Sequence, residues 1–270
     1  MLKLLSAAVA LGMLLIPPAF ITPASAVPTS THDYQFAGTL ADANGGPALK
    51  AIAGGTLGTA AAPGFRFGAN DGLQLAGGVT PGGPWSIELL FDYDTQGNYE
   101  KIIDFSNLTS DSGLYTTYDK LSLYPVIVAP TPQLTSGVLA DLVLTRSAAG
   151  TLNAYVNGTL SFTYDDSRYG ITASSNPLTF FADDATTRGR EAAPGVVQRI
   201  RTYDAVLSST DIQALATAPS PSPIALLEPG TIALICAGLV AAAVMRVIIA
   251  LVQATRAVVP RPARAARRGV

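Results

Sequence analysis

Short apolar runs alternate with turn-forming residues through residues 32–204, a pattern typical of a domain built from β-strands. In Trp85–Tyr93 the odd positions are apolar and mostly polar residues stand between them, which predicts a strand with one buried face. Residues 139–146 alternate less cleanly and predict a more central strand. Asn157-Gly158 lies between two apolar runs and predicts a hairpin, because both residues tolerate the positive φ of a type I′ turn.

The clearest strand-forming runs lie at residues 34–36, 65–67, 73–76, 85–93, 99–105, 114–118, 121–128, 139–146, 152–157, 160–164, 178–181 and 196–203. Residues 208–215 instead predict a helix, because Ser208 stands at an N-cap position with Asp211 three residues further on. The absence of a fixed-period repeat in the sequence argues against propellers and solenoids. The sequence therefore predicts an all-β sandwich over residues 32–217.

Both ends of the chain carry patterns of export and membrane attachment. A charged start and an apolar run precede the small residues Ala24-Ser25-Ala26, so residues 1–26 are predicted to be a removed signal peptide. After a Pro/Ser linker at 218–229, residues 230–252 are long and apolar enough for one transmembrane helix. The basic tail at 253–270 predicts a cytoplasmic C-terminus, with the body exported and held at the cell surface.

The charge of the exported body argues against nucleic acid as a partner. All 19 acidic residues lie between Asp33 and Glu228, together with ten basic residues, so this stretch carries a net charge of −9. Phosphate backbones are bound by Lys and Arg neutralisation, which an acidic body does not offer. The single cysteine, Cys236, lies in the predicted membrane span, so the body must fold on its core without a disulfide.

Four stretches resemble the laminin-G-like, concanavalin A-like domains of bacterial surface proteins. They are an entry strand and turn at 34–46, an aromatic strand at 85–89, a hairpin at 155–158, and a closing strand with a short helix at 199–208. The resemblance covers about residues 33–217. It implies a jelly-roll sandwich of two antiparallel sheets, a fold that often binds one calcium ion.

The C-terminal segment separately resembles the PEP-CTERM sorting signal of bacteria. Glu228, Pro229 and Gly230 stand where that signal has its Pro-Glu-Pro motif, with Leu227 in place of the first proline. An apolar span and an arginine cluster follow, as in the family. The resemblance implies an exosortase-type processing enzyme as a partner, beside the membrane itself.

The sequence does not predict an enzyme. Related jelly-roll enzymes hydrolyse β-glucans with a Glu-x-Asp-x-(x)-Glu strand, because two carboxylates must flank the scissile bond. Here Glu88 stands alone, and Asp92 and Asp94 end its strand with no glutamate in phase. His32 is the only histidine, so a Ser-His-Asp triad or a histidine-based metal site is also disfavoured.

One pair of carboxylates is a candidate metal site. Asp183 and Asp184 are followed by Glu191, and their hard oxygen atoms are the ligands that Ca²⁺ prefers. The laminin-G-like resemblance implies the same ion, although Gln198 stands where that family often has an acid. The alternative is that the two aspartates cap a turn and face water.

The tyrosines are the candidate ligand-binding residues. Tyr115, Tyr118 and Tyr124 can form a platform for sugar rings, or they can pack at the edge of the sandwich core. We therefore expect a non-catalytic surface domain that binds glycan or extracellular matrix polymer. A structural or adhesive component of an exopolysaccharide layer without a discrete site is the alternative, and a glycoside hydrolase is a third.

Overall fold

The computed structural model describes residues 27–173 and 177–218. The predicted signal peptide, most of the linker, the sorting motif at Glu228, Pro229 and Gly230, the membrane span and the basic tail all lie outside these residues, and they stay predictions. Within the described residues, no helix is both long and apolar enough to cross a membrane.

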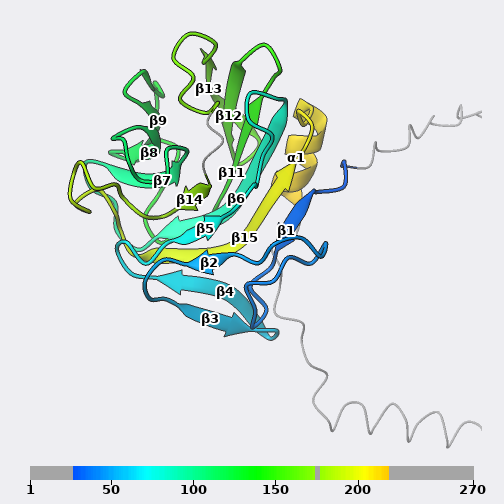
Figure 1. The fold of residues 1–270 in the computed structure, drawn as a ribbon, viewed down its shortest axis with the longest axis vertical. Coiled ribbons are helices and arrows are strands. Elements are labelled where there is room, and N and C mark those ends of the chain that lie inside the picture. The colour runs from blue at the N-terminus through cyan, green and yellow to red at the C-terminus, as the bar shows by residue number, and fades with distance from the viewer. Residues whose placement is uncertain (1–26, 174–176, 219–270) are drawn as a thin grey trace, which may run out of the picture.

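The described residues form two antiparallel sheets, as the sequence predicts (Figure 1). Sheet A has the order β13-β12-β11-β6-β15-β4-β3, and β1 also pairs with β15. Its strands are β1 His32–Tyr34, β3 Thr56–Thr59, β4 Ala62–Phe67, β6 Trp85–Tyr93, β11 Ala140–Arg146, β12 Thr151–Val156, β13 Thr159–Asp165 and β15 Gly195–Tyr203.

Sheet B has the order β10-β9-β8-β7-β14-β5-β2. Its strands are β2 Lys50–Ala51, β5 Leu73–Leu75, β7 Glu100–Asp104, β8 Gly113–Thr117, β9 Lys120–Tyr124, β10 Ile127–Val128 and β14 Leu178–Phe180. The hairpin predicted at Asn157-Gly158 joins β12 to β13, with φ of 50° and 77° at its two residues.

The core lies between the two sheets and is rich in aromatic side chains. Phe67 of sheet A stacks on Phe181 at the end of β14, with ring centroids 4.5 Å apart. Trp85 stacks on Phe105 at 6.0 Å, and both are buried. Burying one such side chain stabilises the fold by roughly 1.5–3 kcal/mol. Packing of this aromatic core therefore stabilises the described domain, which contains no cysteine and so no disulfide.

Sheet A is buried on its second face as well, which the alternation in Trp85–Tyr93 does not indicate. Glu88 points away from the core, yet it is fully buried, because Arg199 and Tyr203 of β15 bond its carboxylate. The helix α1, Ser209–Thr217, covers part of this face and buries Ile212 and Leu215 beside Val143 and Tyr203. The capping box between Ser208 and Asp211 begins this helix, as predicted.

Two other details differ from the sequence pattern. The run 121–128 is two strands, because the chain turns at Tyr124-Pro125 and β10 folds back to pair with β9. The short strands β2 and β3 carry no apolar alternation and were not predicted.

Candidate functional site

The candidate site lies on the outer face of sheet B. Leu114 of β8 and Ile103 of β7 are paired and lie in the core. Tyr115 alternates with Leu114 and points outward, and the register shift between Lys101 and Ile103 puts Lys101, which pairs with Tyr115, on the same outer face. Tyr124 of β9 lies on the same face, opposite Gly113, which has no side chain to occupy the space. Side-chain alternation thus brings residues from three strands to one surface.

Three tyrosine rings meet on this surface. Tyr115 forms the floor and is fully buried, whereas Tyr99 and Tyr124 are only half-buried. Their ring centroids lie 5.8–6.3 Å apart, and each pair is close to perpendicular. Edge-to-face packing of this kind fixes the rings in place and leaves parts of Tyr99 and Tyr124 open to solvent.

Two half-buried carboxylates complete the surface. The Tyr115 hydroxyl donates to Asp111 Oδ1 at 3.1 Å. Glu191 comes from the β14–β15 connection, whose backbone is held where Glu191 O accepts the Lys101 N–H at 2.9 Å. Burial, followed by the charges of Asp111, Asp183 and Asp184, raises the pKa of Glu191 to about 7. We call Tyr99, Asp111, Tyr115, Tyr124 and Glu191 the tyrosine–carboxylate face.

A buried lysine lies directly behind this face. Lys101 Nζ donates to Asp184 Oδ2 at 2.5 Å, to Asp104 Oδ2 at 3.2 Å and to Ser110 O at 3.5 Å. It also lies 5.0 Å from the centre of the Tyr115 ring, within the range of a cation–π contact. Lys101 and its three hydrogen-bond partners thus support the floor of the tyrosine–carboxylate face.

Asp183 and Asp184 are turn-capping residues, but they do not face water. Asp184 Oδ1 accepts the N–H groups of Thr186 and Thr187, and Asp183 Oδ2 accepts the Thr187 hydroxyl. Burial raises the pKa of Asp184, but the Lys101 ammonium and the bonds from Thr186 outweigh it and hold this pKa below its usual range.

The arrangement does not fit a calcium ion while Lys101 is in place. Its ammonium lies among the three carboxylates that a cation would share, and it already supplies the positive charge. Calcium needs six to eight oxygen ligands. Within residues 27–173 and 177–218, no group of three His, Cys, Asp or Glu side chains is placed to hold a metal. Calcium binding is untested, and the position of the Lys101 ammonium argues against it.

The structure brings together two of the three tyrosines expected to bind ligand. Tyr115 and Tyr124 lie 5.9 Å apart, but Tyr118 lies in the β8–β9 turn, 65% exposed and with φ of 47°. The third ring of the group is Tyr99 instead of Tyr118, and Asp111 binds the Tyr115 hydroxyl. Charged residues inside the run 99–105 were the sequence signal that could have located this site, and Lys101 is the one that contacts the Tyr115 ring.

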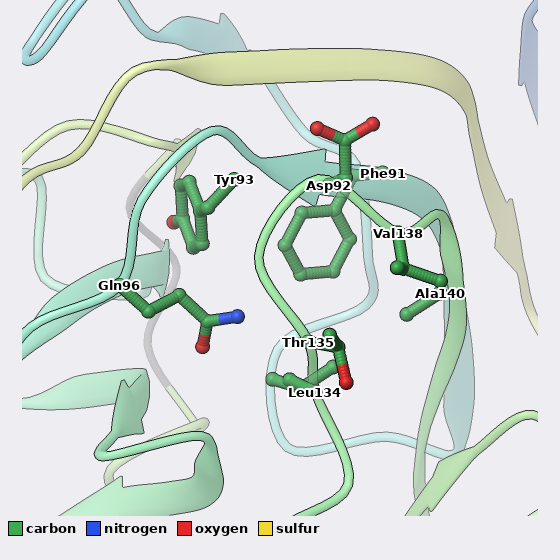
Figure 2. A pocket seen from close by; sticks show the side chains of 8 residues that line it. All are labelled: Phe91, Asp92, Tyr93, Gln96, Leu134, Thr135, Val138 and Ala140. Atoms are coloured by element: carbon green, nitrogen blue, oxygen red, sulfur yellow. The ribbon is translucent and has the colours of Figure 1, made fainter.

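A small cavity beside β6 and β11 is too small for a sugar. It is lined by Phe91, Asp92, Tyr93, Gln96, Leu134, Thr135, Val138 and Ala140 (Figure 2). Its volume is about 10 Å³, which is roughly the space of one water molecule. Glu88 is not accessible to a substrate either, because Arg199 Nε and Tyr203 Oη bond its carboxylate at 2.8 and 3.1 Å.

The family model for the concanavalin A-like lectin/glucanase superfamily, of the laminin-G type, matches residues 67–213, more than half of the chain. The chain belongs to this superfamily. This match confirms the laminin-G-like resemblance of the body. No curated protein matches the chain.

Solved structures share the superfamily fold at low sequence identity. Domain 4 of AbnA, a GH43 extracellular arabinanase from Geobacillus stearothermophilus solved with arabinotriose, has a TM-score of 0.54 and 15% identity, covering 70% of this chain and 98% of that domain. A sialidase of Trypanosoma rangeli has a TM-score of 0.53 and 14% sequence identity, and the match covers 71% of this chain and 34% of the sialidase chain. The binding domain of botulinum neurotoxin serotype D has a TM-score of 0.54 and 13% sequence identity, and the match covers 72% of this chain and 54% of that domain. The chain therefore matches nearly all of the arabinanase domain, but only about a third of the sialidase chain and about half of the neurotoxin binding domain.

Proposed function

We propose that the chain is a non-catalytic glycan-binding protein of the cell surface, and that glycan binds at the tyrosine–carboxylate face. The observation that carries the proposal is the arrangement of Tyr99, Tyr115 and Tyr124 with Asp111 and Glu191 on one open sheet face. Sugar rings present apolar C–H faces and many hydroxyl donors. Aromatic rings pack against the former, and carboxylate oxygens accept from the latter.

The family supports this choice of ligand class. One similar domain was solved with arabinotriose, and it belongs to a larger enzyme rather than being a whole one. The export patterns at the two ends of the sequence support a location outside the cytoplasm, with residues 230–252 as anchor and an exosortase-type enzyme acting at Glu228-Pro229-Gly230.

The test is a glycan array probed with the detergent-solubilised chain, followed by calorimetry on the best ligand. Tyr124→Ala removes a half-buried ring and should weaken binding by roughly two- to tenfold, since one aromatic contact contributes about 0.5–1.5 kcal/mol. Tyr169→Ala is the matched control, because Tyr169 is 63% exposed in the connection after β13 of the other sheet.

Three results would point elsewhere. Retained association with the matrix without binding to any glycan would favour a structural or adhesive role in an exopolysaccharide layer. Equal losses in Tyr124→Ala and Tyr169→Ala would move the ligand site away from the tyrosine–carboxylate face. Release of reducing sugar from a polysaccharide panel would favour a glycoside hydrolase.

A further inference from the structure

The tyrosine–carboxylate face carries more negative charge than the chain itself neutralises. The groups that act electrostatically on Glu191 are Asp111, Asp183, Asp184 and Lys101. Lys101 is the one cation in this set, against three aspartates and Glu191, whose carboxyl, with a pKa of about 7, is partly ionised at neutral pH. A ligand at this face therefore meets a strongly negative local potential, and screening is weak over distances shorter than the Debye length of about 8 Å.

The hydrogen-bond donors of Lys101 are also fully used. An ammonium has three donors, and those of Lys101 go to Asp184, Asp104 and the Ser110 carbonyl. Asp183 Oδ1 lies 3.9 Å from Lys101 Nζ and accepts no hydrogen bond from the described residues. Asp183 is only 6% exposed, so this oxygen is buried. The single positive charge of Lys101 faces three carboxylates, those of Asp104, Asp183 and Asp184.

Glu191 lies between these buried carboxylates and the protein surface. Its backbone N–H donates to Asp183 Oδ2 at 3.0 Å, its side chain is half-buried, and its carboxylate charge acts on Tyr115 and Tyr124. Glu191 and Asp111 form no ion pair within the described part of the chain. A cation that binds Glu191 would therefore be attracted both by the Glu191 carboxylate and by the negative charge of the aspartates behind it.

We infer that the glycan bound at this face carries free amino groups, so that an ammonium of the sugar pairs with Glu191 while its ring packs on Tyr124. The same charges repel anionic sugars such as uronates and sialic acids. This inference rests on the proposed function, because it specifies the chemistry of the glycan at the same site.

The experiment compares three tetrasaccharide probes by calorimetry on the detergent-solubilised chain at near-neutral pH and low salt. They are a glucosamine tetramer, its fully N-acetylated form and tetragalacturonate. We expect the glucosamine tetramer to bind at least tenfold more tightly than the acetylated one, and tetragalacturonate not to bind. The preference should shrink as salt is raised, because screening acts on the charge term alone.

Glu191→Gln separates charge from shape. It should weaken the glucosamine tetramer about tenfold and leave the acetylated tetramer within twofold. Asp165→Asn is the control, because Asp165 is an exposed acid on β13 of sheet A, away from the tyrosine–carboxylate face. A cooperative unfolding curve of Glu191→Gln, with a midpoint no lower than that of the natural chain at the assay pH, would show that the variant is folded.

The outcomes distinguish this inference from the proposed function. Equal affinity for the glucosamine and acetylated tetramers, or tighter binding of tetragalacturonate, would overturn the inference and leave glycan binding intact. A preference for the glucosamine tetramer that survives in Glu191→Gln would also overturn it. A chain that binds none of the three probes, nor any glycan on the array, would overturn both.

Discussion

Replacing Lys101 with methionine should cost a large share of the stability of the domain. Lys101, Asp104, Asp183 and Asp184 all have fully buried side chains, so removal of the ammonium leaves buried carboxylates without a counter-charge. Removing one partner of a buried ion pair costs about 3–5 kcal/mol. Because whole domains are stable by only about 5–15 kcal/mol, the loss would be visible in any unfolding assay.

The defect should also depend on pH. In the natural chain the pKa of Asp184 lies below its usual value, so this group stabilises the fold at neutral pH and loses that contribution as the pH falls through its folded pKa. In Lys101→Met, burial without the ammonium raises the carboxyl pKa instead. The folded variant then holds extra protons, so its deficit is largest at neutral pH and shrinks toward about pH 4.

The assay is urea unfolding followed by tryptophan fluorescence. Trp85 is the only tryptophan and lies fully buried in the core, so its emission reports on the sandwich in the detergent-solubilised chain. Lys50→Met is the control, because Lys50 is exposed on β2, and such surface changes usually stay within about 0.5 kcal/mol. A loss in Lys101→Met below about 1 kcal/mol at pH 7, or an equal loss at pH 7 and pH 4.5, would refute the reasoning.

Four further predictions can be checked with the same chain. Residues 1–26 should be absent from the mature protein, and an intact N-terminal peptide in mass spectrometry would contradict this. Deleting residues 231–270 should release a soluble body that keeps its strand signal in circular dichroism, and aggregation would contradict a separate core. Millimolar calcium should leave the unfolding midpoint unchanged because Lys101 supplies the charge, whereas an upward shift lost in Asp184→Ala would establish the calcium site. Glu191→Gln should raise the unfolding midpoint at pH 8 but not at pH 4. The raised pKa of folded Glu191 means that the natural chain loses stability as the pH rises through about 7, and glutamine avoids this loss. A midpoint raised equally at pH 4 and pH 8 would contradict the prediction.

Local patterns predicted the fold well where one physical effect dominates. The alternation in Trp85–Tyr93 gave a strand, Asn157-Gly158 gave its hairpin, and Ser208 with Asp211 gave the start of the helix. Each depends on neighbours within a few residues. The strands β2 and β3 were not predicted, because they are only two and four residues long and show no apolar alternation, although Ala51 and Leu57 pack against the core.

The site was harder to predict, because its parts come from distant segments. Lys101 and Asp184 are 83 positions apart, and their contact depends on β14 pairing beside β7. Glu88 and Arg199 are 111 positions apart and meet only through the β6–β15 register. Sequence alone shows that the run 99–105 contains Glu100, Lys101 and Asp104. It does not show which partners neutralise the buried Lys101.

The position of β15 has a consequence for the order of folding. β15 is the last strand in the part of the chain that the structure describes, yet it pairs with β6 on one side and with β4 and β1 on the other, at the middle of sheet A. Until residues 195–203 are available, the two halves of this sheet have no strand to join them. A chain that emerges from its N-terminus, in synthesis or in the export that residues 1–26 predict, therefore cannot complete sheet A before its final strand appears.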